Sequence, residues 1–102
     1  AVARTATAES DIREIFAFIG SNSRKSAQKF NDDLAATLER LREFPHSGYK
    51  VAGYNRPLLA VRVSSRFRRY IVIYRLPDDD SLVVMRVLYG ARDIASLIAD
   101  MR

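Results

Sequence analysis

The 102-residue sequence predicts an α+β fold, in which a helical hairpin packs on one face of a mostly antiparallel sheet. Two observations support this fold class. Apolar residues recur every three or four positions in the first half of the chain, and this spacing changes to two after residue 57. The predicted order is β-α-α-β-β-β with a short C-terminal helix. Because the chain is 48% hydrophobic and long enough for one core, we expect a single domain over residues 1–102.

The first half of the chain is expected to form an edge strand followed by two helices. Residues 2–6 are the predicted strand, and Thr7 can cap the helix that follows. The segment "GSNS" at 20–23 ends this helix and offers the next cap. A second amphipathic helix covers residues 27–44, after which proline and glycine stop it. Since the link is short, the two helices should form an antiparallel hairpin.

After a loop at 45–57, three strands are expected at residues 58–63, 70–76 and 82–89. The segment "PDDD" at 77–80 is typical of a tight hairpin connection. If Leu76 pairs with Ser81 and no bulge interrupts the ladder, side-chain alternation sorts the strand residues onto two faces. One face has no formal charge and should carry the helical hairpin. Its predicted members are Leu59, Val61, Val63, Tyr70, Val72, Tyr74, Val83, Met85, Val87 and Tyr89.

The opposite face is expected to combine aliphatic side chains with one arginine from each strand. Its predicted members are Leu58, Ala60, Arg62, Ile71, Ile73, Arg75, Leu82, Val84, Arg86 and Leu88. Because burying an unpaired guanidinium costs several kcal/mol, this face should be open or covered by an acidic partner. A half-apolar, half-cationic sheet face is typical of a partner-binding groove. The alternative is that the C-terminal helix folds back and covers it.

The charge of the chain points to an anionic partner. The formal net charge is +5, and most of the 17 basic residues are arginines. From Arg56 to Arg75 the sequence holds six arginines and no acid. Arginine favours planar, multi-donor contacts with carboxylates and phosphates, so either nucleic acid or an acidic protein segment fits. A solvated basic surface is the alternative.

Few kinds of catalytic or metal chemistry fit this composition. There is no cysteine, His46 is the only histidine, and no acids stand at ligand spacing, so we expect no metal and no cofactor. No apolar run is long enough to span a membrane and no signal peptide is visible, so we expect a cytoplasmic protein. One enzyme class stays open: a ribonuclease could stabilise phosphate charge with Arg62, Arg66, Arg86 and Tyr89.

Nearly the whole chain resembles the RelE/ParE superfamily of bacterial type II toxins, and most closely its ParE branch. The stretches that carry the resemblance are "TAESDIREIFAFIGSNS", "AQKFNDDLAATLERLREFPHSG" and "RRYIVIYRL…LVVMRVLYGARDI". The last stretch is similar to the family's arginine-tyrosine strand, its hairpin and its closing R-V-L-H-G-A-R-D motif. Tyr89 departs from that motif, since ParE proteins commonly carry histidine there.

The resemblance implies a growth-inhibiting toxin that acts on DNA gyrase without catalytic residues of its own. It also implies a ParD-like antitoxin as partner in a hetero-oligomer. RelE relatives instead cut mRNA on the ribosome, so a ribosome-dependent endonuclease is one alternative, and a non-toxic basic interaction module is another. We expect antitoxin contacts at Arg62, Arg75, Arg86, Leu58, Ile73, Val84 and Leu88. Target contacts are expected at Arg66, Arg68, Arg69, Tyr89 and Arg92.

Overall fold

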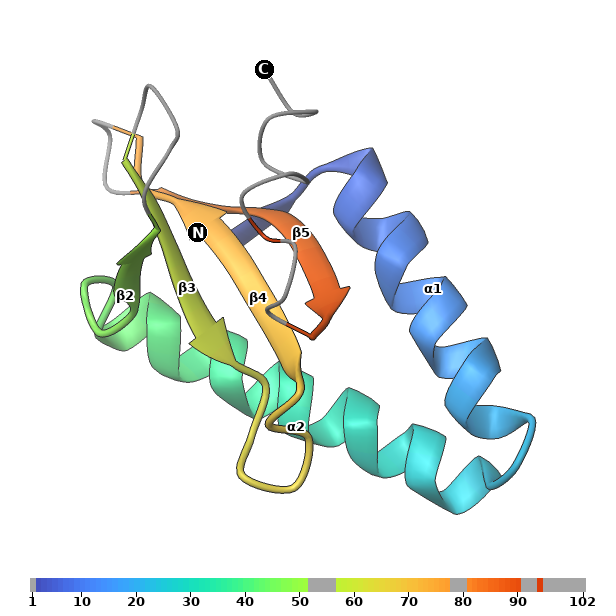
Figure 1. Cartoon of the computed structure of the whole chain (residues 1–102). Coiled ribbons are helices and arrows are strands. Elements are labelled where there is room, and N and C mark those ends of the chain that lie inside the picture. The colour runs from blue at the N-terminus through green and yellow to red at the C-terminus, as the bar shows by residue number, and fades with distance from the viewer. Residues whose placement is uncertain (1, 52–56, 78–80, 91–93, 95–102) are drawn as a thin grey trace.

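The computed structural model describes residues 2–51, 57–77, 81–90 and 94. Within them the chain forms β1 (Val2–Arg4), α1 (Ala6–Gly20), α2 (Arg24–Glu43), β2 (Tyr49–Val51), β3 (Leu58–Arg62), β4 (Tyr70–Arg75) and β5 (Leu82–Tyr89). The predicted α+β fold with a helical hairpin is confirmed (Figure 1). The predicted C-terminal helix lies outside the described residues except for Ile94. No helix in the described ranges has both the length and the apolarity needed to cross a membrane.

Both helices begin at capping hydroxyl groups. Thr5 caps α1, because its side-chain oxygen accepts a hydrogen bond from Ala8 N at 3.0 Å. The sequence placed this cap at Thr7. Thr5 is favoured because its hydroxyl also donates to the Met85 carbonyl at 2.9 Å, a contact from β5 that sequence alone does not reveal. Ser23 caps α2 in the same way, accepting from Ser26 N at 3.1 Å.

The five strands lie in the order β1-β5-β4-β3-β2. β1 runs parallel to β5, and the other neighbours pair antiparallel. β2 corrects the sequence analysis, which treated residues 45–57 as a loop. A three-residue strand is too short to show a period of two, and it is ordered here because Tyr49, Lys50 and Val51 pair with β3.

A bulge in β5 overturns the predicted strand register. Ile73 pairs with Arg86 and the next residue, Tyr74, pairs with Val84, so Met85 is left without a partner across β4. The predicted pairing of Leu76 with Ser81, and the register built on it, is therefore wrong. One extra residue reverses the alternation in the first half of β5.

The bulge also exchanges residues between the two faces of the sheet. Leu82 and Val84 pack with the helices, although the sequence placed them opposite, and Met85 packs on the other face. The rest of the predicted helix-facing side is confirmed for β3, β4 and the end of β5. The buried residues of this first cluster are Ala8, Phe30, Leu34, Leu38, Leu41, Val63, Tyr70, Val72, Tyr74, Leu82, Val84 and Val87.

A second apolar cluster lies on the face of the sheet that points away from the helices. Its buried residues are Leu58, Ala60, Ile71, Ile73 and Leu88. Val51, Met85 and Ile94 pack against them. The prediction that this face is open is therefore wrong for its aliphatic residues. The alternative in which a C-terminal helix covers this face concerns residues that, apart from Ile94, lie outside the described ranges.

Candidate functional site

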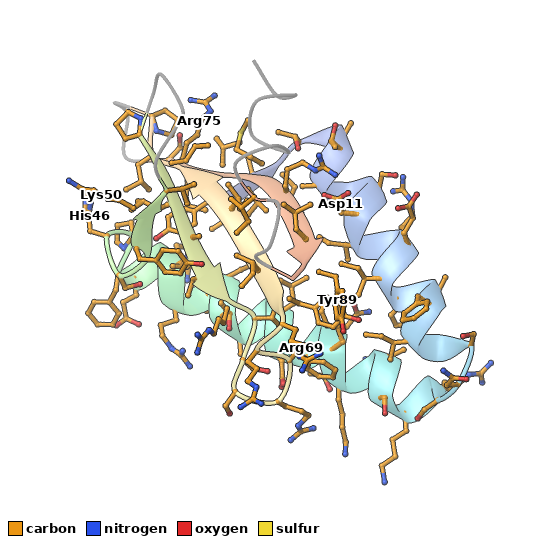
Figure 2. The ribbon with its side chains drawn as sticks, in the orientation of Figure 1. Asp11, His46, Lys50, Arg69, Arg75 and Tyr89 are labelled. Carbon is orange, nitrogen blue, oxygen red and sulfur yellow. The ribbon has the colours of Figure 1, made fainter. Side chains whose placement is uncertain are left out.

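The three strand arginines that were predicted to share one face do not form a cluster. Arg86 is bound to α1, where Asp11 lies against it. Arg75 ends β4, whereas Arg69 directly precedes that strand, so the two lie at opposite ends of it (Figure 2). Arg62 ends β3 and lines a pocket with Arg69. The single arginine face of the prediction is thus divided into three separate environments.

Arg86 forms a two-pronged ion pair with Asp11. Its Nε donates to one carboxylate oxygen at 2.8 Å, and its Nη2 donates to the other at 3.1 Å. The Val87 backbone N–H also donates to Asp11, at 3.0 Å. The side chains of Arg86 and Asp11 are only 21% and 11% exposed. The hydrogen bond that Arg86 donates to Asp11 raises the pKa of Arg86 against the opposing effect of burial. This arginine therefore joins α1 to β5.

The apolar residues predicted to contact an antitoxin are buried in the fold. Leu58, Ile73 and Leu88 belong to the second cluster, and Val84 lies in the first. None of the four is more than 7% exposed. The structure gives them a packing role, and their contact with a partner stays a prediction.

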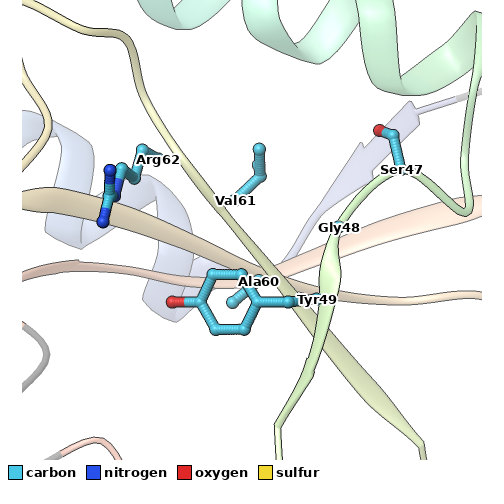
Figure 3. A pocket seen from close by; sticks show the side chains of 6 residues that line it. All are labelled: Ser47, Gly48, Tyr49, Ala60, Val61 and Arg62. Atoms are coloured by element: carbon cyan, nitrogen blue, oxygen red, sulfur yellow. The ribbon is translucent and has the colours of Figure 1, made fainter.

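Three neighbouring pockets form a groove that we call the arginine groove. The first, of about 380 Å³, is lined by residues 47–49 and 60–62 (Figure 3). The second, of about 260 Å³, shares Tyr49 and Arg62 with the first. The third, of about 300 Å³, shares Arg68 and Arg69 with the second. The pockets are therefore neighbours that share lining residues. The strand pairing puts Tyr49 on the face of the second cluster and Tyr89 beside Tyr70 on the helix-packed face, so the groove passes round the end of the sheet.

Arginines line the arginine groove, and an exposed tyrosine lies at each end of it. Its four arginines are Arg62, Arg66, Arg68 and Arg69, and all are exposed. Tyr49 and Tyr89 are 51% and 62% exposed at its two ends. Among the described residues, no carboxylate lines these pockets and no ion pair joins the four arginines to another side chain. The groove therefore offers cationic donors and aromatic rings to a ligand.

The third of these pockets is held in shape by α2. The Ser64 hydroxyl donates to Asp33 at 2.8 Å and accepts from Phe67 N at 3.0 Å. Thr37 donates to the Val63 carbonyl just before this turn. The loop between β3 and β4, which carries three of the arginines, is therefore fastened to the helix at successive positions.

Aromatic packing continues this support under the groove. Phe67 and Tyr70 both pack edge-on against Phe30 of α2, with ring centres 5.4 and 5.2 Å away. The ring centres of Tyr89 and Tyr70 lie 4.9 Å apart, and the two rings are tilted against each other. Burial and the neighbouring Tyr89 raise the pKa of Tyr70. Tyr70 is therefore neutral under ordinary conditions and acts as a packing group.

The end of the groove coincides with the end of β5. Gly90 has a φ of +80°, a conformation that suits glycine, and its N–H donates to the Arg69 carbonyl at 2.6 Å. This bond places Tyr89 next to Arg69, as Figure 2 shows. Arg92, the remaining predicted target residue, lies outside the described residues. The predicted target residues Arg66, Arg68, Arg69 and Tyr89 are therefore brought together.

Sequence reasoning missed two contributors to this site. Tyr49 was assigned to a loop, because a three-residue strand carries no periodic signal. Asp33 was one of several polar residues on an amphipathic helix, and only its three-dimensional contact with Ser64 sets it apart. Across the described ranges, no group of three histidine or acidic side chains is placed to hold a metal ion.

Comparison with known families gives one match. The family model described as the ParE toxin of the type II toxin–antitoxin system parDE matches residues 2–94. The matched segment contains both helices and all five strands, together with every residue that lines the arginine groove. No curated protein matches the sequence significantly.

Proposed function

The chain belongs to the ParE toxin family of type II toxin–antitoxin systems, and from this premise we propose that it arrests growth by inhibiting DNA gyrase. The observation that carries the proposal is the family match, because it spans nearly the whole domain. We further propose that a ParD-like antitoxin neutralises the protein and that both act in the cytoplasm, where gyrase works on DNA.

We place the target contact at the arginine groove. Arg66, Arg68, Arg69 and Tyr89 are exposed there on a loop and strand end that α2 holds in place. Arginines on a loop whose backbone is already held, beside an exposed aromatic ring, are suited to a large anionic partner, since little backbone ordering remains to be done on binding.

The proposed mode of action is inhibition without catalysis by the toxin itself. The described residues that line the arginine groove include no histidine, lysine or carboxylate. General acid–base catalysis near neutral pH depends on such groups, because their pKa values can be brought close to the operating pH. A binding role fits these side chains better than an RNA-cleaving one.

The antitoxin is expected to approach through arginines that remain accessible. Arg62 is exposed and Arg75 is half-buried, whereas Arg86 is already occupied by Asp11. We therefore keep Arg62 and Arg75 as proposed antitoxin contacts and assign Arg86 to the fold. Calorimetry with the antitoxin encoded beside the toxin should show weaker binding for Arg75→Ala. An unchanged Kd for both Arg62→Ala and Arg75→Ala would remove them from the interface.

Growth and supercoiling assays test the central proposal. Induction of the protein should stop growth and cause DNA breaks, and the purified protein should inhibit supercoiling by gyrase. The double variant Arg68→Gln, Arg69→Gln should lose both effects, whereas Arg13→Gln on α1 should keep them. Unimpaired supercoiling at saturating protein would exclude gyrase as the target, and transcripts cut within translated mRNA would instead identify a ribonuclease.

A further inference from the structure

We propose that the arginine groove binds single-stranded nucleic acid, with phosphates on its arginines and bases stacked on Tyr49 and Tyr89. The inference goes beyond the proposed function, because it names a ligand that the isolated toxin binds without gyrase or antitoxin. It concerns binding only and involves no cleavage step.

The shape of the groove favours an extended ligand. Its pockets adjoin one another round the end of the sheet, because Tyr49 and Arg62 line the first two, and Arg68 and Arg69 line the last two. A ligand that reaches both Tyr49 and Tyr89 has to pass from one face of the sheet to the other, which a flexible extended chain can do and one compact molecule cannot. Double-stranded nucleic acid keeps its bases stacked inside the helix, so only a single strand offers bases to the exposed rings.

The charges favour a phosphate backbone. Four exposed arginines lie along the groove without an acidic partner among the described residues. A guanidinium presents several donors in a plane, which matches phosphate oxygens, and it is only weakly hydrated. Successive phosphates along one strand can therefore be contacted by successive arginines, with release of counterions.

The exposed rings favour nucleic acid over an acidic peptide. Tyr49 and Tyr89 are among the few large aromatic side chains that the described chain leaves exposed. An acidic peptide would use the arginines but would leave these rings in water. Nucleobases stack on such rings, and stacking on an aromatic side chain is tolerant of base sequence. Tyr89 is ready for this role because Tyr70 supports it from one side, at 4.9 Å.

The groove is also ordered before any ligand arrives. Asp33 holds Ser64, which in turn binds the Phe67 N–H, and Gly90 binds the Arg69 carbonyl. These bonds fix the backbone on both sides of the three loop arginines. Less conformational entropy is then lost when a flexible single strand binds.

Fluorescence anisotropy of labelled oligo(dT) and oligo(U) with the purified full chain tests the proposal. At low salt, about 50 mM, both oligomers should bind, and affinity should fall steeply as salt is raised. Arg68→Gln and Arg69→Gln should each weaken binding about fivefold and reduce the salt slope by about 0.7. Tyr89→Ala should weaken binding about tenfold, whereas Tyr89→Phe should retain it because the ring remains.

Three controls keep the outcome decisive. Arg13→Gln removes one positive charge from α1 outside the groove, so it should bind normally. Thermal unfolding of each variant checks that it is folded. If Tyr89→Ala is unfolded, the contribution of the rings is tested by comparing the affinities of Tyr89→Phe and Tyr49→Ala. Electrophoresis of the oligomers after binding should show them intact. The tighter of the two oligomers identifies DNA or RNA as the natural source.

The proposal is overturned if neither oligomer binds, or if Arg13→Gln weakens binding as much as Arg69→Gln. It is equally overturned if an oligo-glutamate of equal charge displaces the oligomers at equal concentration, or if Tyr89→Ala and Tyr49→Ala both bind normally. The assay contains neither gyrase nor antitoxin, so its failure leaves the growth and supercoiling results standing. Conversely, binding of oligomers by a protein that does not inhibit gyrase would refute only the proposed target.

Discussion

Asp11 holds the junction between the first helix and the last strand. It accepts two hydrogen bonds from Arg86 and one from the Val87 backbone, so all its partners lie on β5. Removing one member of such a pair leaves the other charged group poorly solvated and without its partner, which costs more than the loss of a surface pair. The ion pair between Asp11 and Arg86 therefore contributes more to the stability of the fold than a surface pair would.

We expect Asp11→Ala to lower the free energy of unfolding by about 2–4 kcal/mol. Arg86→Ala should have a comparable effect, since the same contacts are lost. The measurement is urea unfolding of the purified protein. Arg13→Ala is the matched control, because its ion pair with Glu9 is solvent-exposed at 4.0 Å and should contribute no more than about 1 kcal/mol. Equal losses of unfolding free energy for Arg13→Ala and Arg86→Ala would show that the ion pair between Arg86 and Asp11 does not stabilise the fold.

Tyr74 clamps the turn that leads from α2 into β2. Its hydroxyl donates to the Pro45 carbonyl at 2.8 Å and accepts from the Gly48 N–H at 3.0 Å. Gly48 has to remain small, because a Cβ atom there would lie 2.5 Å from that hydroxyl oxygen and 2.8 Å from the Ala60 carbonyl oxygen. Burial raises the pKa of Tyr74, and the Gly48 bond opposes this only in part.

This pKa shift predicts a loss of stability in alkali. The neutral phenol is favoured in the folded state, so its contribution is complete below the unfolded pKa of about 10 and is lost as pH rises through the folded value. Tyr74→Phe should cost about 1–2 kcal/mol at pH 7 and should flatten the alkaline fall. Unfolding curves at pH values from 7 to about 11 measure both effects, with Tyr49→Phe as the exposed control. Parallel pH profiles for Tyr74→Phe and the parent would contradict the assignment.

The loop between β3 and β4 is held in place by hydrogen bonds from side chains of α2. Thr37 and Asp33 lie one turn apart on the helix, and each holds a successive residue of the loop, Val63 and Ser64. The arginines of this loop thus receive their position from a helix distant in the sequence. These helix–loop contacts, with the bond between Gly90 and Arg69, hold the backbone of the groove in place.

Asp33→Ala is expected to loosen this loop while leaving the helices intact. Ser64 loses its acceptor, so the bond that orders the Phe67 N–H is weakened. Hydrogen exchange should become faster across residues 64–69 and stay unchanged in the middle of α1. Asp32→Ala, one position away and exposed, serves as the matched control. Unchanged exchange in the loop, or an equal acceleration in Asp32→Ala, would show that Asp33 does not position it.

How far the sequence predicts an element depends on how local its cause is. The helical hairpin and the strands at 58, 70 and 82 follow from periodicity and turn residues, and these were predicted. The bulge at Met85 was not, because the groups that bond the backbone there, Thr5 and Asp11, are far away in the chain. The candidate site follows the same rule: the arginines and Tyr89 were predicted, whereas Tyr49 and Asp33 depend on tertiary pairing.

At the scale of the whole molecule, the sheet is buried on both faces. Helices cover one face, and the second apolar cluster lies on the other. One arginine from each of the three predicted strands led us to expect that second face to be open. In the structure Arg62 and Arg75 end their strands and Arg86 is paired with Asp11, so aliphatic residues can be buried between them. The four exposed arginines of the groove thus lie at one margin of a two-sided core.

Substitution of Ile73 tests whether the second face of the sheet is buried or open. It is 0% exposed at the centre of the second cluster, as is Val72 in the first. A buried isoleucine loses both transfer energy and packing when it is cut back, so Ile73→Ala should lower the free energy of unfolding by about 2–4 kcal/mol. The melting temperature should then fall by about 10 °C or more. Val72→Ala is the matched variant, and calorimetry should show a comparable or smaller loss there. If Val72→Ala destabilises the protein and Ile73→Ala does not, the second face is open, and its aliphatic residues become available to an antitoxin.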